Sequence, residues 1–202
     1  MSERLDALPV RAPQAVHQER GDAARNRALL LQAARNLIAE RGADAVTMDD
    51  VAAAAGVGKG TLFRRFGSRA GLMMVLLDED ERASQQAFLF GPPPLGPDAP
   101  PLDRLVAFGR ERIRFVHAHH ELLSAANRDP QNRYNAPATV LRTHVRVLLQ
   151  GAHTSGDLDA QTDALLALLD VDYVEHQLHD AGHTTQTLGD AWESLARKLC
   201  GR

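Results

Sequence analysis

Glycines divide the segment 47–69 into short pieces, and this division constrains the fold more than any other feature of the chain. Thr47 places a hydroxyl at a cap position and Asp50 places a carboxylate three residues later, which is typical of the first turn of a helix. Gly56 permits the positive φ that a tight turn requires. We therefore predict a short helix after Thr47, a turn at Gly56, and a second short helix over Lys59–Phe66.

Helices are also predicted on both sides of this segment. The preceding helix begins near Arg25, ends at Gly42, and has small and apolar residues at helical spacing: Leu29, Leu30, Ala33, Ala34, Leu37 and Ile38. Ser68 is expected to cap the following helix.

The remainder of the chain shows helical periodicity and no alternation typical of strands. A proline-rich loop at 91–101 precedes four predicted helices, at 105–119, 136–152, 160–180 and 184–200. We therefore expect an all-α protein.

Two short helices joined by a glycine turn form a helix-turn-helix unit, whose second helix lies in the major groove of DNA. Leu62 and Phe66 are spaced i and i+4 and should face inward. Four polar residues are then left to face outward, where they suit phosphates and base edges: Lys59, Thr61, Arg64 and Arg65. From spacing alone, a helical hairpin with solvated charges remains an alternative.

The distribution of charge favours the DNA interpretation. Residues 1–77 carry eleven Lys and Arg against eight Asp and Glu, whereas residues 78–202 carry twelve against eighteen. A mildly basic front half joined to an acidic back half fits a module that meets phosphate followed by one that does not.

The segment TMDDVAAAAGVGKGTLFRRFGSRAGL, residues 47–72, resembles the DNA-binding signature of the tetracycline-repressor (TetR) family. With the preceding helix, the resemblance covers residues 24–80. It implies a flexible tail at 1–22, a three-helix helix-turn-helix domain at 23–67, and a larger helical domain for ligand binding and dimerisation at 68–202. The implied function is that of a ligand-responsive, sequence-specific DNA-binding regulator, and repression is the usual mode of the family. Such a regulator would bind a near-palindromic operator as a dimer and would be released by an unknown small-molecule effector.

The resemblance also implies roles for single residues. Thr47 and Arg69 would contact phosphate, and Arg64 would reach a base or a phosphate. Phe63 and Gly58 stand where the family often has tyrosine and serine, so two hydroxyl contacts are absent, and Arg64 with Arg65 would replace one of them. The predicted DNA-binding residues are Thr47, Gly58, Lys59, Gly60, Thr61, Phe63, Arg64, Arg65 and Arg69.

In the C-terminal part, the leucine-rich segment 160–180 and the last helix are predicted to pair across a two-fold axis, with ordinary core packing as the alternative. The predicted dimer residues are Leu165, Leu168, Leu169, Val174, Leu188, Trp192 and Leu195. Side chains that mix aromatic and polar character in apolar helices are candidates for an effector pocket: Phe115, His119, Asn127, Tyr134, His144, Tyr173 and His176.

Two sets of histidines are candidates for a metal site. One set is spaced i, i+3 and i+7 and consists of His176, His179 and His183, but Gly182 is expected to end the helix that would carry it. The other set consists of His117, His119 and His120, and side chains so close in sequence are expected to point apart. The sequence therefore predicts no metal and no cofactor.

Other function classes receive less support. We find no nucleophile elbow, phosphate loop or HExxH motif, so we expect no enzyme. A helical adaptor would use the leucine-rich C-terminal helices and would not need Lys59 or Arg64. One cysteine, no long apolar run and a polar start predict a cytoplasmic protein without disulfides.

Overall fold

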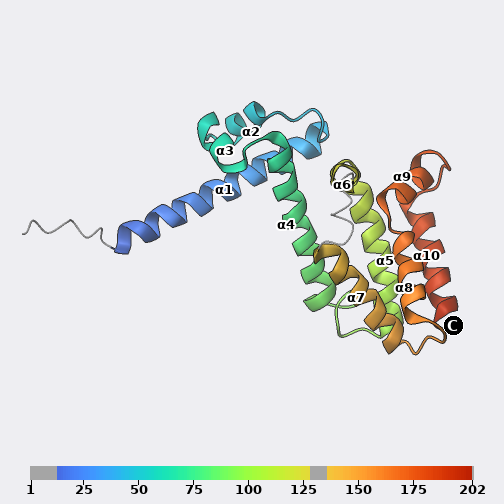
Figure 1. Ribbon diagram of the computed structural model, residues 1–202. Helices are drawn as coiled ribbons and strands as arrows, with labels where there is room; N and C mark the ends of the chain where they lie inside the picture. The colour runs from blue at the N-terminus through green and yellow to red at the C-terminus, as the bar shows by residue number, and fades with distance from the viewer. Residues whose placement is uncertain (1–12, 128–135, 202) are drawn as a thin grey trace, which may run out of the picture. The chain divides into compact units, whose positions relative to one another are not determined.

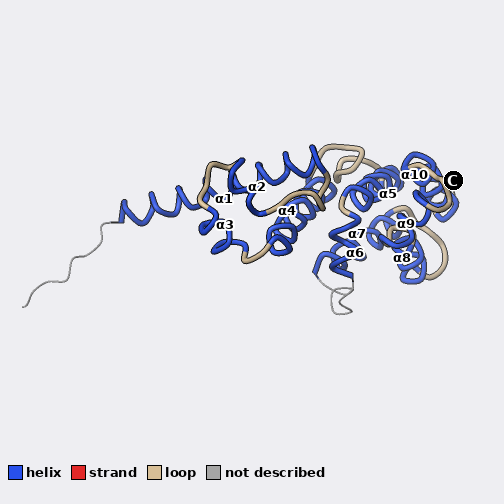
Figure 2. Tube along the Cα trace, turned by 90° about the horizontal axis from the view of Figure 1, so that it is seen from above, coloured by secondary structure: helices blue, strands red, loops and turns tan. Residues whose placement is uncertain are grey.

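The computed structural model describes residues 13–127 and 136–201, and within these residues it contains ten helices and no strand. Figures 1 and 2 show this all-α architecture, which confirms the predicted fold class. The chain divides into two compact units, an N-terminal unit over Met1–Leu76 and a C-terminal unit over Leu77–Arg202. The division falls inside a helix, whereas the sequence placed the boundary between residues 67 and 68. None of the described helices is both long enough and apolar enough to cross a membrane.

The N-terminal unit consists of three helices and the beginning of a fourth. These are α1 (Pro13–Arg41), α2 (Met48–Ala54), α3 (Lys59–Phe66) and α4 (Arg69–Phe90). Helix α2 packs against both α1 and α3. The buried side chains that join them include Leu30, Ala34, Val51, Leu62 and Phe66.

Helix α1 begins at Pro13, well before the predicted start, so residues 13–22 are helical and not part of a tail. Proline is tolerated in the first turn of a helix because the amide of that turn has no helical partner. The residues that follow lack an apolar stripe, and hydrophobic periodicity therefore gave no sign of the helix.

The C-terminal unit holds the end of α4 and six further helices: α5 (Pro101–Ala118), α6 (His120–Asn127), α7 (Ala136–Gly151), α8 (Leu158–Ala167), α9 (Val171–His179) and α10 (Thr185–Leu199). Helix α5 is central, because it packs against α6, α7, α9 and α10 (Figure 1). The proline-rich segment 91–100 is a loop, as predicted, and Pro101 opens α5.

Helices α5 and α10 pack closely because Gly109 presents no side chain. A Cβ at Gly109 would lie 1.9 Å from Cε2 of Trp192. Trp192 is fully buried, and its indole N–H donates to the carbonyl of Leu105 at 2.9 Å. At the edge of the contact, the Arg110 guanidinium donates to Asp190 at 2.6 Å and to Glu193 at 2.7 Å. The Glu193 and Asp190 carboxylates raise the pKa of Arg110.

Two features of the C-terminal unit differ from the sequence prediction. The expected single helix over 160–180 is two helices, α8 and α9, because Asp170 caps a new helix by accepting from the amide of Asp172 at 3.0 Å. Helix α6 was not predicted, and it follows α5 after a break at His119. The apolar pattern of the leucine-rich segment does not mark this cap, so the sequence predicted one continuous helix.

Within the C-terminal unit, α4 and α5 are joined by a buried ion pair. Arg112 donates to Glu81 at 2.9 Å, and their side chains are 6% and 11% exposed. The guanidinium carbon of Arg112 also lies 4.3 Å from the ring centroid of Phe115, and that ring stacks on His119. His119 continues the link, because its Nε2 lies 3.0 Å from the carboxylate of Asp80 on α4.

Candidate nucleic-acid interface and ligand cavities

A capping box opens α2, as predicted. The Thr47 hydroxyl accepts from the amide of Asp50 at 3.2 Å, and the Asp50 carboxylate accepts from the amide of Thr47 at 3.1 Å. The Thr47 hydroxyl also donates to the Asp50 carboxylate at 2.7 Å, so a phosphate would compete with Asp50 for this hydroxyl. The two bonds that the carboxylate accepts, from the Thr47 hydroxyl and amide, lower the pKa of Asp50.

The turn and the second helix also follow the prediction. Gly56 has φ of +64°, a region that favours glycine. Leu62 and Phe66 are buried, whereas Lys59, Arg64 and three further residues of α3 are at least partly exposed: Gly60, Phe63 and Arg65. Helix α3, which packs against α2, therefore has one buried apolar face and one exposed basic face.

Lys59 is held at the beginning of α3 by a residue that the sequence analysis did not single out. Its ammonium lies 2.7 Å from the Asp49 carboxylate on α2 and 5.9 Å from the centroid of the Phe63 ring. Both charged side chains are more than half exposed, so water and salt screen the pair. The role of Lys59 in DNA binding stays a prediction.

The remaining basic residues have different surroundings. The Arg64 guanidinium donates to the Thr61 hydroxyl at 3.4 Å, a long bond on an exposed surface. Arg69 instead donates to the carbonyls of Val46, at 2.9 Å, and of Ala43. Arg69 thus ties the beginning of α4 to the loop before α2, and its role as a phosphate clamp stays a prediction.

The predicted effector residues do not gather in one place. Phe115 and His119 belong to the contact between α4 and α5, and Tyr173 and His176 lie exposed on α9. Tyr134 and the side chain of Asn127 lie outside the described residues. His144 is the candidate that lines a cavity.

The cavity at His144 has a volume of about 310 Å³ and is mostly apolar. We call it the His144 cavity. It lies among the end of α4, the first turn of α5, and α7. Its lining residues are Leu89, Arg104, Thr139, Val140, Thr143, His144 and Val147.

Two polar atoms of this cavity are buried without a partner. Within the described part of the chain, neither Nε2 of His144 nor Nε of Arg104 has a hydrogen-bond partner. The His144 ring packs against both Phe88 and Phe108, with centroids 4.4 Å and 5.1 Å away. Burial, and then the charge of Arg104, lowers the pKa of His144 to about 4, so the imidazole is neutral at pH 7. An arginine and a neutral imidazole beside apolar walls suit a small ligand with a polar end.

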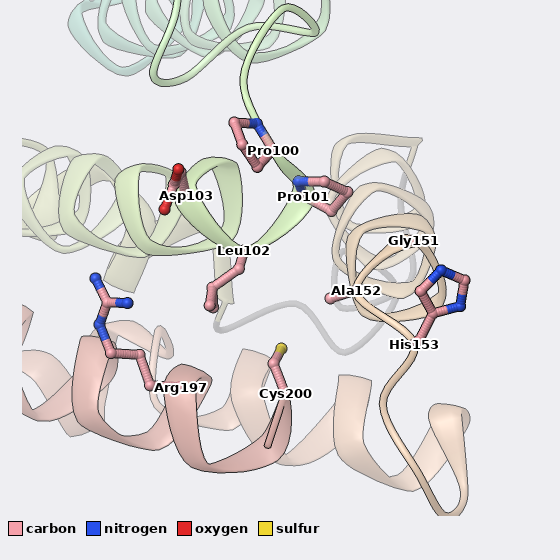
Figure 3. Close-up of a pocket in the computed structure, with 9 residues that line it drawn as sticks. All are labelled: Pro100, Pro101, Leu102, Asp103, Gly151, Ala152, His153, Arg197 and Cys200. Carbon is pink, nitrogen blue, oxygen red and sulfur yellow. The ribbon is translucent and has the colours of Figure 1, made fainter. Parts of the chain in front are cut away.

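Two other cavities have fewer features of a ligand site. One, of about 380 Å³, lies where the beginning of α5 meets the ends of α7 and α10, and Figure 3 shows Leu102 and Cys200 on opposite walls of it. The other, of about 250 Å³, is bordered by Arg112 and Leu169. The Arg112 charge in this cavity is already matched by Glu81.

Four of the predicted dimer residues prove to be core residues of a single chain. Leu165, Leu169, Val174 and Trp192 are each at most 9% exposed. Their side chains pack within the C-terminal unit, and their place at a dimer interface stays a prediction. The partly exposed residues of the set remain candidates: Leu168, Leu188 and Leu195.

Comparison with known proteins connects this architecture to a family. Residues 30–74 match the family model described as bacterial regulatory proteins, tetR family. The matched span contains the capping box, the turn and α3, which are the features described above. No curated relative matches the sequence.

Solved structures share the fold over most of both chains. A protein described as a TetR-family transcriptional regulator from Rhodococcus sp. has 19% identity and a TM-score of 0.61, with 88% of this chain and 99% of that chain covered. A transcriptional regulator from Saccharomonospora viridis, solved with choline, has 19% identity and a TM-score of 0.65, with 85% and 95% covered. A TetR-family regulator from Mesorhizobium loti has 16% identity and a TM-score of 0.60, with 88% and 96% covered. Residues 30–74, which hold the helix-turn-helix, therefore match the tetR family of bacterial regulatory proteins, and the chain shares the fold of solved TetR-family transcriptional regulators.

Proposed function

We propose that the protein is a sequence-specific repressor that binds a near-palindromic operator as a homodimer and is released by a small-molecule effector. The observation that carries the proposal is the basic exposed face of α3, which lies within the span that matches the family model. The helix is short and docked by Leu62 and Phe66, so its outer side chains are held on a rigid support. As a regulator of bacterial genes it would act in the cytoplasm and without catalysis.

The DNA-binding residues divide into two groups by chemistry. Lys59, Arg65 and Arg69 carry charge that suits phosphates, together with the polar groups of Thr47 and the open backbone at Gly58 and Gly60. Thr61 in the first turn of α3 and Arg64 one turn further on suit base edges in the major groove. Phe63 is 40% exposed and offers an apolar surface in place of a hydroxyl.

We place the effector in the His144 cavity and propose an apolar molecule with a carboxylate or another acceptor at one end. The Arg104 guanidinium in the lining supports an acceptor, and the apolar walls support an uncharged body. The structure from Saccharomonospora viridis holds choline, which is a cation. A cation in the His144 cavity would meet the charge of Arg104, so we do not transfer that ligand to this chain.

Helix α4 is the proposed route from effector to DNA. Leu89 near its end lines the His144 cavity, and Arg69 at its beginning bonds the loop before α2. An effector shifts the population of DNA-binding molecules only if it binds two arrangements of the protein with different affinity. A displacement of α4 would supply such a difference.

The first experiment is selection of random duplex DNA by the purified full-length protein in moderate salt, followed by sequencing of the bound pool. Enrichment of a near-palindrome supports the proposal. Recovery of no enriched sequence, from protein shown to be folded by circular dichroism and freed of bound ligand by unfolding and refolding, would contradict it and favour a helical adaptor.

The effector class has its own test. Thermal shift is measured with straight-chain carboxylates and with choline, on the wild type and on Arg104→Gln. We expect the carboxylates to raise the melting temperature of the wild type and not of Arg104→Gln. A shift with choline alone would contradict the assignment.

A further inference from the structure

Three histidines surround one glutamate at the corner where α5 and α6 meet α9. The side chains, which we call the His-Glu cluster, are His117, His120, Glu175 and His179. Helices α5 and α6 both pack against α9, and Figure 1 shows α9 beside this corner. The cluster is remote in sequence from the DNA-binding residues and shares none of the residues that line the His144 cavity.

The Glu175 carboxylate is the centre of the cluster. Its Oε1 lies 3.3 Å from Nδ1 of His117, and its Oε2 lies 2.9 Å from Nε2 of His179. Nδ1 of His120 is 3.9 Å from the same Oε2. Within the described part of the chain, the ion-pair partners of Glu175 are histidines alone, and its side chain is 16% exposed. A metal ion would accept lone pairs from the imidazole nitrogens and share the Glu175 carboxylate.

Helical spacing arranges the four side chains as two pairs. His117 and His120 are three residues apart across the end of α5, with ring centroids 6.2 Å apart. Glu175 and His179 are four residues apart on one face of α9. Two such pairs on facing elements are a recurring way to surround a metal ion.

The backbone holds one imidazole of the cluster. Nδ1 of His120 lies 3.0 Å from the backbone carbonyl of His117, so a proton on Nδ1 would be donated there and Nε2 would be the nitrogen that binds a metal once the ring rotates. His119, between the two, is directed elsewhere, because its Nε2 faces Asp80 and its Nδ1 faces the carbonyl of Phe115. His119 thus points away from His117 and His120, as expected for sequence neighbours. His117 and His120 themselves lie close together.

Three nitrogens and one carboxylate oxygen are ligands that zinc, nickel and copper accept. Zn²⁺ with bonds of about 2.0–2.1 Å places tetrahedral ligands ~3.3 Å apart. One ligand atom each from His117, His120 and Glu175 lies within 4.8 Å of the others. Rotation of these partly exposed rings would close the remaining gap.

We propose that this corner of the C-terminal unit binds one zinc-class divalent cation through four side chains: His117, His120, Glu175 and His179. The ion would join the end of α5 and the beginning of α6 to α9. The site differs from the histidine set that the sequence suggested, because His176 instead pairs with Asp180 at 2.8 Å and His183 lies beyond the end of α9. The proposal does not depend on DNA binding, since metal binding is measured without DNA.

The test is calorimetric titration of Zn²⁺ into the untagged, metal-free full-length protein, with a competing chelator. We expect one ion per chain in the wild type. Glu175→Gln and His120→Gln should weaken binding by at least ~100-fold, because loss of an outer-shell partner alone costs about 10–100-fold. His176→Gln is the matched control on α9 and should bind as the wild type does.

Two readouts separate loss of a ligand from loss of folding. Circular dichroism of the metal-free variants should match the wild type, and Zn²⁺ should raise the melting temperature of the wild type and of His176→Gln only. Co²⁺ in place of Zn²⁺ should show the intense visible absorption of four-coordinate cobalt in the same two proteins. Absence of stoichiometric Zn²⁺ binding in the wild type, or equal binding by Glu175→Gln and His120→Gln, would overturn the proposal.

Discussion

At the scale of single residues, burial decides what His144 can do. The ring is 6% exposed, packs against two phenylalanines and carries an unpartnered Nε2. A histidine that is neutral in the folded protein but protonates in the unfolded chain makes folding depend on pH. The same residue thereby connects the proposed effector cavity to the stability of the C-terminal unit.

We expect the free energy of unfolding to fall as the pH drops from 6.5 toward 4. In that window the unfolded chain binds a proton at His144, whereas the folded chain, in which the pKa is lowered to about 4, does not. Each pKa unit corresponds to about 1.4 kcal/mol, so the loss attributable to this group is ~3 kcal/mol at most. Urea unfolding at pH 7.5 and pH 5 measures it. His144→Leu should lose less stability across this interval than the wild type, and an equal loss in both proteins would contradict the assignment.

Two single substitutions on α3 distinguish contacts to phosphates from contacts to bases. Arg64→Ala should cost about 1–3 kcal/mol on the cognate operator and relax base preference. Lys59→Ala should weaken binding to all sequences and reduce the salt slope by about 1. Lys198→Ala on α10 is the control. Binding measured between ~50 and 200 mM salt reports both effects, and unchanged affinity in both variants would disprove the assignment of α3.

The structure adds a substitution with the opposite sign. Asp49 is the present partner of Lys59, so Asp49→Asn should remove a charge that repels phosphate and tighten DNA binding. The gain should stay below about 1 kcal/mol, because exposed ion pairs are weak. Weaker binding by Asp49→Asn would show instead that this carboxylate positions Lys59 for DNA.

At the scale of elements, the contact between α5 and α10 depends on the absence of a side chain at Gly109. We expect Gly109→Ala to destabilise the C-terminal unit by about 1–3 kcal/mol or more, because its Cβ would overlap the Trp192 indole. Gly60→Ala on α3, where a Cβ meets no atom within 4 Å, is the control, and alanine should stabilise that helix by about 0.5–1 kcal/mol. Urea unfolding compares the two, and a neutral effect at Gly109 would mean that the helices can separate without cost.

At the scale of the whole molecule, the proposed two-fold dimer fixes the spacing of the operator. Recognition helices related by a two-fold axis contact half-sites about 34–36 Å apart, one turn of DNA. Inserting about 5 base pairs, half of the ~10.5 base pairs of a turn, places the second half-site on the opposite face of the duplex. Affinity should fall to that of a single half-site, and gel-shift titrations measure the change. Equal affinity for both spacings would contradict a rigid dimer.

The sequence by itself determined the local features of the N-terminal unit. Thr47, Asp50 and Gly56 act through bonds and backbone angles within a few residues, and such preferences are visible in the order of residues alone. The all-α class and the inward positions of Leu62 and Phe66 followed from periodicity in the same way. The part of α1 before Arg25 was not predicted as a helix because it has no apolar stripe.

Only the tertiary structure decided which distant residues meet. Periodicity marks Leu165, Val174 and Trp192 as buried, but it does not say whether they pack within one chain or against a second, and the structure places them in the core. The Asp49 partner of Lys59, the neutral state of His144 and the meeting of His117 with Glu175 all depend on helices that pack from separate parts of the sequence. Contacts across the fold depend on three-dimensional packing, and a single sequence records only the preferences of each segment.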